Sequence, residues 1–171
     1  INITINSSKV SGNLTDFPIY LDLADMPNVF FNNTNSDGSD IRMTTSDGVT
    51  ELPREVVSIN TTVQSGEVHF RGNLTNTSDD IFWIYYNNSA ASEPAANSTF
   101  GSENVWSNGY RLVMHLEEQG NSSSNEYQDS TRFHNHGQGG GGTASEVPTR
   151  ITGKVGSGQN YSGTDWIGIP N

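Results

Sequence analysis

The sequence predicts an all-β protein of the β-sandwich or jelly-roll type, and three observations carry this prediction. Short runs of alternating apolar and polar residues recur about every ten residues, which is the spacing of strands in such folds. Gly, Asn and Asp, the residues that favour turns, stand between the runs. The chain is 32% hydrophobic, and its three Trp, six Tyr and seven Phe lie mostly inside these runs, which indicates a folded chain rather than a disordered one.

The first part of the chain supplies the alternating runs one after another. Residues 1–6 place three Ile on one face and Asn and Thr on the other. A second run places Phe17, Ile19, Leu21 and Leu23 on one face. Further strands are expected at residues 41–44 and 49–52, joined by a tight turn at 46–48, and then at 55–59, 67–71 and 81–86.

The pattern changes near residue 104, and we therefore predict two units. Residues 1–104 would form a β-sandwich, and residues 105–171 an incomplete second β unit. Residues 92–97 are expected to form one helical turn, with Ser as the cap and Pro near its start. In the second unit, residues 110–117 alternate as a strand would, and residues 137–143 have the low complexity of a Gly-rich linker.

The tail, residues 153–170, is predicted to form a strand, a Gly-bounded corner and a second strand at 166–169. This second strand is apolar or Gly on both faces, so it requires cover on both sides. Because only Pro170 and Asn171 follow it, we expect another molecule to supply that cover. The residues expected to carry this donor strand are Tyr161, Trp166, Ile167 and Ile169.

Charge and composition exclude several classes of partner. The net charge is −11, and Lys9 and Lys154 are the only lysines, which is the wrong sign for nucleic acid or an anionic membrane. No run is long and apolar enough to span a membrane. The absence of Cys excludes disulfides and Cys-ligated zinc.

Several separated motifs resemble one family. They lie at residues 36–42, 47–48, 52–55, 84–88 and 91–93, and they occur in the same order as in the domain-of-unknown-function family numbered twenty-three-forty-one. That family is found in large secreted and surface proteins of bacteria and archaea. The resemblance covers about residues 1–104 and implies a β-sandwich in an extracellular setting, with no assigned activity.

The second unit resembles the opening strands of a laminin-G or concanavalin-like jelly roll. The resemblance rests on residues 110–116, 129–130, 135–137, 153–156 and 161–166. A jelly roll of that type has many further strands. The resemblance therefore implies either a part of a longer protein, whose other strands complete the fold, or a shortened unit with another purpose.

Sites for N-linked glycans are dense in this sequence. Eleven Asn-x-Ser/Thr sequons occur, where roughly four would be expected by chance. We expect glycans at several of them, the alternative being that an Asn- and Thr-rich β protein generates sequons incidentally. The candidate residues are Asn2, Asn6, Asn13, Asn32, Asn60, Asn73, Asn76, Asn87, Asn97, Asn121 and Asn160.

Acidic turns offer a candidate site for calcium, the one cofactor that the sequence suggests. Asp37, Asp40 and Asp47 lie in two Gly-containing turns and could supply the oxygen ligands that calcium prefers. No EF-hand spacing is present, and Asx turns, in which Asp caps its own turn, explain these residues without a metal. Capping is the favoured interpretation.

No catalytic signature emerges, so we expect a protein that is not an enzyme. His134 and His136 lack a third ligand nearby and fit a solvated loop. Glu117 and Glu118 would point to opposite faces of a strand, whereas paired catalytic carboxylates must converge.

The aromatic residues have two interpretations. They could line a carbohydrate platform, but aromatic residues in strands more often belong to the core, and Trp83 and Tyr85 are expected there. The residues in question are Trp83, Tyr85, Trp106, Tyr110 and Trp166.

These observations predict a structural subunit of an extracellular fibril or surface filament. Subunits would join head-to-tail by β-strand complementation, with another copy of the chain as partner and residues 137–142 letting the tail swing clear. Residues 1–5 are the alternative donor strand. The alternative function is a carbohydrate-binding or adhesive module of a larger cell-surface protein.

Overall fold

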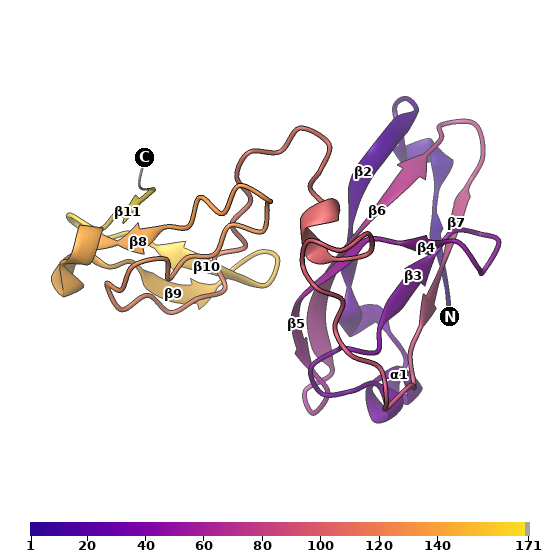
Figure 1. Ribbon diagram of the computed structural model, residues 1–171, viewed down its shortest axis with the longest axis horizontal. Coiled ribbons are helices and arrows are strands. Elements are labelled where there is room, and N and C mark those ends of the chain that lie inside the picture. The colour runs from indigo at the N-terminus through magenta and orange to yellow at the C-terminus, as the bar shows by residue number, and fades with distance from the viewer. Residues whose placement is uncertain (170–171) are drawn as a thin grey trace. The chain divides into compact units, whose positions relative to one another are not determined.

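The computed structural model describes residues 1–169 of the chain and confirms the all-β prediction. The chain divides into two compact units, Ile1–Asn108 and Gly109–Asn171, and each is described by itself (Figure 1). The first unit extends a few residues beyond position 104, because the ring of Trp106 packs at a tilt against His69 and its indole N–H donates to Glu55 at 2.6 Å. None of the helices in the described residues has the length and apolar character needed to cross a membrane.

The first unit contains two antiparallel sheets (Figure 1). The four-stranded sheet has the order β1 (Asn2–Ile5), β7 (Asp80–Tyr85), β3 (Arg42–Thr44), β4 (Glu51–Leu52). The three-stranded sheet has the order β2 (Leu14–Asp22), β6 (Ser65–Leu74), β5 (Arg54–Asn60). The strands expected from the alternating runs are thus all present, and β3 and β4 pair as the predicted hairpin.

The apolar core of this unit draws on both sheets. Successive side chains of a strand point to opposite faces, so β6 buries Val68 and Phe70 while β7 buries Phe82 and Ile84. The rings of Phe70 and Phe82 meet edge to face at 5.0 Å between centroids. Helix α1 (Asn28–Asn33) adds two further rings to the core, those of Phe30 and Phe31.

The structure differs from the sequence prediction at three places in the first unit. Residues 92–97 form no helical turn, whereas α1 is a helix that was not predicted from the sequence. The face of β7 is also reversed: Phe82 and Ile84 are buried, while Tyr85 is 46% exposed. The prediction that Trp83 and Tyr85 belong to the core is therefore wrong, because they share the solvent face.

The second unit contains two short antiparallel ladders (Figure 1). One joins β9 (Thr149–Thr152) to β10 (Ser157–Asn160), and the other joins β8 (Gln138–Gly139) to β11 (Ile167–Gly168). Residues 153–156 are the turn of the β9–β10 hairpin and not the expected strand. The strand expected at 110–117 is also absent, because that segment pairs with no other strand among the described residues.

Short 3₁₀ helices complete the two units. They are η1 (Ser7–Lys9), η2 (Leu23–Asp25), η3 (Ser102–Asn104), η4 (Gly140–Gly142) and η5 (Ala144–Glu146).

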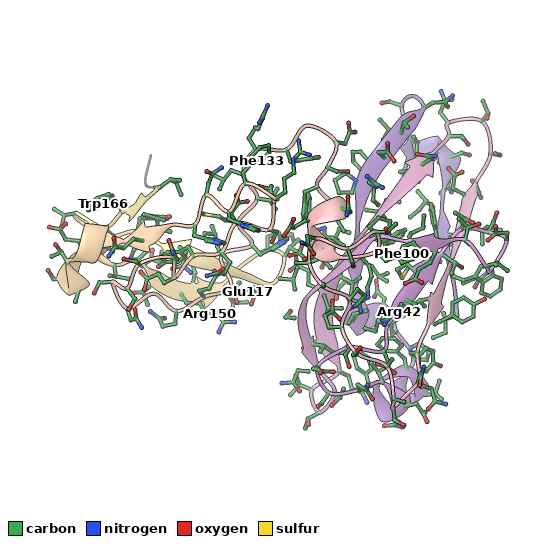
Figure 2. All side chains as sticks on the ribbon, viewed as in Figure 1. Arg42, Phe100, Glu117, Phe133, Arg150 and Trp166 are labelled. Carbon is green, nitrogen blue, oxygen red and sulfur yellow. The ribbon has the colours of Figure 1, made fainter. Side chains whose placement is uncertain are left out.

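Two carboxylates, one buried and one half-buried, organise loops of the second unit. Asp129 is 3% exposed and accepts the N–H groups of Val113, Thr131 and Asn135 at 2.8–3.0 Å. Glu117 accepts from the Arg150 guanidinium at 3.0 Å, and the two residues lie side by side (Figure 2). These contacts fix loops that have few strand hydrogen bonds of their own.

Candidate assembly site

The predicted donor strand is docked on its own unit. Ile167 pairs with Gly139 and Gly168 with Gln138, so the ladder extends over two residues of each strand. The carbonyl of Trp166 accepts from Gly140 N–H at 2.8 Å, and its indole N–H donates to Glu146 at 3.1 Å. The tail is thus held by a short ladder and a few flanking hydrogen bonds.

This docking half-buries Ile167 and leaves other large side chains of the tail exposed. Tyr161 is 51%, Trp166 45% and Ile169 38% exposed (Trp166 is labelled in Figure 2). Ile169 and Trp166 border a shallow cavity of about 200 Å³ beside Gln138 and Gly141. The two-sided cover that the apolar run requires is therefore not supplied within the unit, and the part of the tail at Pro170 lies outside the described residues.

The Gly-rich segment is not the free linker that the sequence predicts. It contains β8 and η4, and Gly139 N–H donates to Glu126 at 2.7 Å. Its glycines permit close packing: a Cβ added to Gly141 would lie 2.6 Å from the Trp166 ring. The segment is therefore the surface on which the tail rests, and the tail leaves only when the β8–β11 ladder opens.

The first unit contains a strand edge that is paired on one side alone. β7 pairs with β1 over Asp80–Trp83, but β3 reaches only Trp83–Tyr85 before it ends at Thr44. Ile84 exchanges two hydrogen bonds with Ile1, at 2.9 and 3.1 Å. Because alternate residues of an antiparallel strand face the same neighbour, the N–H and C=O of Ile81 point away from β1, to the side that β3 has left.

A groove of about 560 Å³ opens at this edge, between the two sheets. Its apolar lining includes Leu52, Phe82 and Phe100 (Phe100 is labelled in Figure 2). Acidic residues at the groove are engaged with neighbours: the Asp79 carboxylate accepts Ser7 N–H at 2.8 Å, and this bond holds the pKa of Asp79 below its usual value. The remaining lining residues are Asp16, Thr45, Ser46, Glu51, Pro53, Arg71, Gly72, Asn73, Ser78, Asp80, Ile81 and Thr99.

A second cluster unites the motifs that carry the family resemblance. Asp40, which is 2% exposed, accepts the N–H groups of Asn35 and Asn87 at 2.9 and 2.8 Å. The Arg42 guanidinium donates to the carbonyls of Ser39 and Ser92, both at 2.8 Å. These bonds hold the loop after β7 against the loop before β3.

Arg54 completes this cluster as a fully buried cation. Its two terminal nitrogens meet both carboxylate oxygens of Glu93 at 2.5 and 2.7 Å, and its Nε–H donates to the Ile41 carbonyl at 2.6 Å. A bidentate Arg–carboxylate pair of this kind is directional and strong. Both partners, Glu93 and Ile41, are structural, so the cluster fastens the 91–93 segment to the sandwich.

The three candidate calcium ligands do not converge. Among the described residues Asp37, Asp40 and Asp47 form no group whose ligand atoms could share one ion. Asp47 instead accepts from the Thr50 hydroxyl at 2.6 Å and from Thr50 N–H at 2.9 Å, and these bonds lower its pKa. Asp37 accepts Ser39 N–H at 3.0 Å, which likewise lowers the pKa of Asp37. These are the bonds expected if Asp37 and Asp47 cap their own turns without a metal, which is the favoured interpretation.

All eleven candidate glycosylation asparagines are exposed. Several use their side-chain oxygen to cap a turn, as Asn6 does for Ser8 N–H and Asn60 for Thr62 N–H. Such capping occupies the amide oxygen and leaves the amide nitrogen, to which a sugar attaches, on the surface. The attachment of glycans at several of these sites stays a prediction.

The five candidate aromatic residues do not form one platform. Trp106 is 6% exposed, whereas Tyr85 and Trp166 are about half exposed and belong to different units. Trp83 and Tyr85 do share the outer face of β7. Their polar ends are fixed to the β3–β4 turn, Trp83 Nε1–H donating to Ser46 at 3.3 Å and Tyr85 OH to Gly48 at 3.1 Å.

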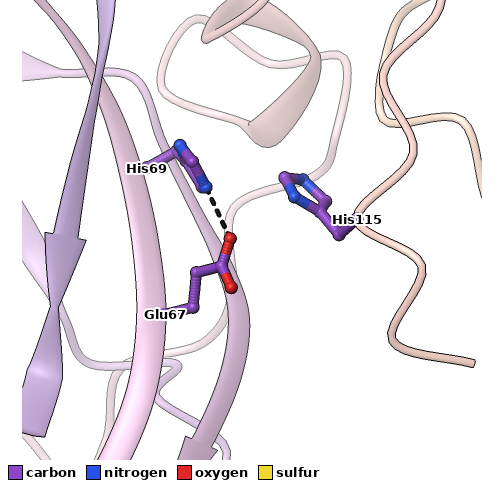
Figure 3. A group of neighbouring side chains, drawn as sticks. All are labelled: Glu67, His69 and His115. Atoms are coloured by element: carbon purple, nitrogen blue, oxygen red, sulfur yellow. Dashed lines mark hydrogen bonds and ion pairs between the residues drawn. The ribbon is translucent and has the colours of Figure 1, made fainter. Parts of the chain in front are cut away.

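The histidines have local partners. His134 and His136 stack at 5.5 Å, and Nδ1 of His136 accepts the N–H of Asp129. On the outer face of β6, His69 Nε2 lies 2.8 Å from Glu67 (Figure 3). This pair is not among the sites predicted from the sequence, although residues two apart on a strand share a face and the spacing of His69 and Glu67 indicates it.

Comparisons with known proteins return no match: no family model, no curated protein and no solved structure matches the chain. The two resemblances drawn from the motifs therefore stay predictions.

Proposed function

We propose that the protein is a structural subunit of an extracellular filament that assembles head-to-tail by β-strand complementation. The observation that carries this proposal is the edge of β7 at Asp80–Phe82, which has a strand partner on one side alone and borders a groove of about 560 Å³. The tail of a neighbouring copy, at residues 166–169, is the strand that fills it.

The chemistry of donor and acceptor supports this pairing. Main-chain hydrogen bonds to Ile81 would fix the added strand, and the apolar groove residues Leu52 and Phe100 would receive its side chains. The donor run carries no charged residue, so it adds no carboxylate to an acidic groove. Donor and acceptor are different surfaces, so each added subunit presents a new groove and the contact propagates.

The extracellular setting is supported by the surface. The exposed sequons and the net charge of −11 suit a solvated, glycan-bearing exterior. Calcium binding stays a proposal for that setting. It is weaker than the filament proposal, because the Asp37 and Asp47 carboxylates already cap turns.

A mixing experiment tests the proposal with two variants of the whole chain. One lacks residues 164–171 and keeps its groove. The other carries Ile81→Pro, which removes the outward N–H of the edge and keeps the tail. We expect neither variant to polymerise alone and a one-to-one mixture to form a heterodimer, as measured by light scattering and electron microscopy. Filaments of the tail-deleted variant, or a mixture that stays monomeric, would contradict the proposal.

A control is needed because proline could unfold the first unit. Phe100→Ala keeps the strand and removes apolar lining from the groove, and it should weaken assembly in the same direction. A free peptide of residues 161–169 should shorten filaments of the unmodified chain, whereas the same peptide carrying Ile167→Pro should not.

The alternative function, a carbohydrate-binding module, is favoured by the half-buried Trp83 and the exposed Tyr85 on the solvent face of β7. A monomer that is retained on immobilised polysaccharide, and is released by Trp83→Ala, would support that function in place of the filament.

A further inference from the structure

The sequon at Asn2 lies directly opposite a tryptophan. In the ladder between β1 and β7, Asn2 pairs with Trp83 and Thr4 with Ile81. Residues directly opposite in an antiparallel pair have Cβ atoms about 5 Å apart on the same face. That face is the solvent face, since Asn2, Thr4 and Ile81 are exposed while Phe82 and Ile84 are buried.

The aromatic strip beside this sequon is fixed and partly exposed: Trp83 is half-buried, whereas its neighbours on the same face are exposed. Trp83 and Tyr85 are held at their polar ends by Ser46 and Gly48, so their orientation does not depend on a ligand. Ile81 is 40% and Tyr85 46% exposed. The face of an aromatic ring carries partial negative charge and attracts C–H groups with partial positive charge, such as those on the flat face of a pyranose sugar.

Asn2 differs from the two other candidate sites that have a residue directly opposite them in a strand ladder. Asn60 faces Ser65, and Asn160 faces Thr149, so neither has a ring opposite. Within the described residues the Asn2 side chain forms no hydrogen bond, whereas the Asn60 oxygen caps a turn. An amide without a capping role can turn toward the ring without breaking another contact.

We infer that Asn2 carries an N-linked sugar whose first pyranose ring packs against the Trp83 indole. The chain's own glycan then covers the aromatic strip on the outer face of the four-stranded sheet. In this arrangement Trp83 is a positioning residue for a covalently attached sugar and not a receptor for free polysaccharide. The inference does not depend on filament assembly, because it involves β1 and β7 of a single copy.

The first measurement is glycopeptide mapping of the protein from its natural source. A hexose or N-acetylhexosamine is expected on Asn2, and its absence there would overturn the inference. In the glycosylated chain, nuclear magnetic resonance should show the C–H protons of that sugar shifted upfield by the indole ring. Unshifted protons would equally overturn it.

A double-mutant cycle measures whether sugar and ring interact. Removing the sugar with Thr4→Ala should lower the Tm of the first unit by a few degrees when Trp83 is present and by much less in a Trp83→Thr background. Trp83→Tyr, which keeps a ring, should restore part of the effect. The matched control, Thr62→Ala at the Asn60 sequon, should show no coupling to Trp83. Equal losses of Tm with and without Trp83 would contradict the inference.

Discussion

Different forces stabilise the interiors of the two units of this chain. The first unit buries a continuous set of apolar side chains, among them Phe30, Phe70 and Phe82, between two sheets. In the described part of the second unit the large buried side chains are few, chiefly Tyr127 and Pro148, and charged groups such as Asp129 lie among them. Apolar burial is independent of pH and grows with unit size, whereas hydrogen-bonded carboxylates must stay ionised.

This difference in the two interiors predicts a difference in their resistance to unfolding. We expect the first unit to unfold last on heating or acidification, and the second, which holds the tail, to open first. The following experiments test that division, from the largest expected effect to the smallest.

Phe82→Ala should destabilise the first unit by about 4 kcal/mol, because it removes a buried ring and leaves a cavity against Phe70. Tyr85→Ala, on the same strand but 46% exposed, is the matched control and should cost no more than about 1 kcal/mol. Calorimetry should show the transition of the first unit alone moving. Similar costs for both variants would contradict the assignment of faces on β7.

Asp129→Ala should destabilise the second unit by about 3 kcal/mol, because it leaves several buried N–H donors without an acceptor. Hydrogen exchange at Thr131 and Asn135 should accelerate, while the first unit stays protected. Asp165→Ala is the control, since Asp165 accepts from Ser162 N–H at 2.9 Å on the surface. Unchanged exchange in the Asp129 variant would refute the structural role of this carboxylate.

Gly141→Ala should release the tail more than Gly163→Ala does. Both glycines have φ near +60°, at which a Cβ costs about 1 kcal/mol, but only at Gly141 would the Cβ also meet the Trp166 ring. The difference between the variants therefore reports the packing of Trp166. Limited proteolysis after residue 160 should be faster for Gly141→Ala, and equal rates would show that this packing does not retain the tail.

Acidification should weaken the second unit before the first, because the first-unit carboxylates with a lowered pKa, those of Asp37, Asp47 and Asp79, are exposed to screening by water, whereas Asp129 is buried. Burial alone would raise the pKa of Asp129, but the N–H donors of Val113, Thr131 and Asn135 outweigh it and hold the pKa below 3.8. A lowered folded-state pKa contributes stability that is present above the unfolded value and is lost as pH falls from about 4 through the folded value. Asp129→Asn should flatten this dependence of Tm on pH. Unfolding of the first unit at a higher pH than the second would contradict this prediction.

Much of the first unit could be predicted from the sequence, because its strands alternate and its turns are marked. Which face of β7 is buried could not be predicted, since residues 81–86 are apolar on both faces. Periodicity therefore does not choose between Phe82 and Trp83 as the buried residue. In the second unit, residues 110–117 alternate but have no strand to pair with, a property that depends on the rest of the fold. Glycines at 137–142 indicate flexibility and close packing equally well.

The candidate groove was beyond sequence reasoning for a similar reason. It exists because β3 leaves the sheet at Thr44 while β7 continues to Asp80, and no local pattern records where two strands part. The apolar run of the tail, in contrast, can be read from the sequence, since residues 166–169 are all apolar or Gly.

The short β8–β11 ladder has a kinetic and concentration-dependent consequence for assembly. The tail's own binding surface competes with a neighbour's groove at the effective concentration of a short tether, on the order of millimolar. Exchange between copies therefore requires the groove to bind the tail more tightly than Gln138 and Gly139 do. A subunit built this way would stay monomeric while dilute and polymerise above a critical concentration, which loosening of the ladder would lower.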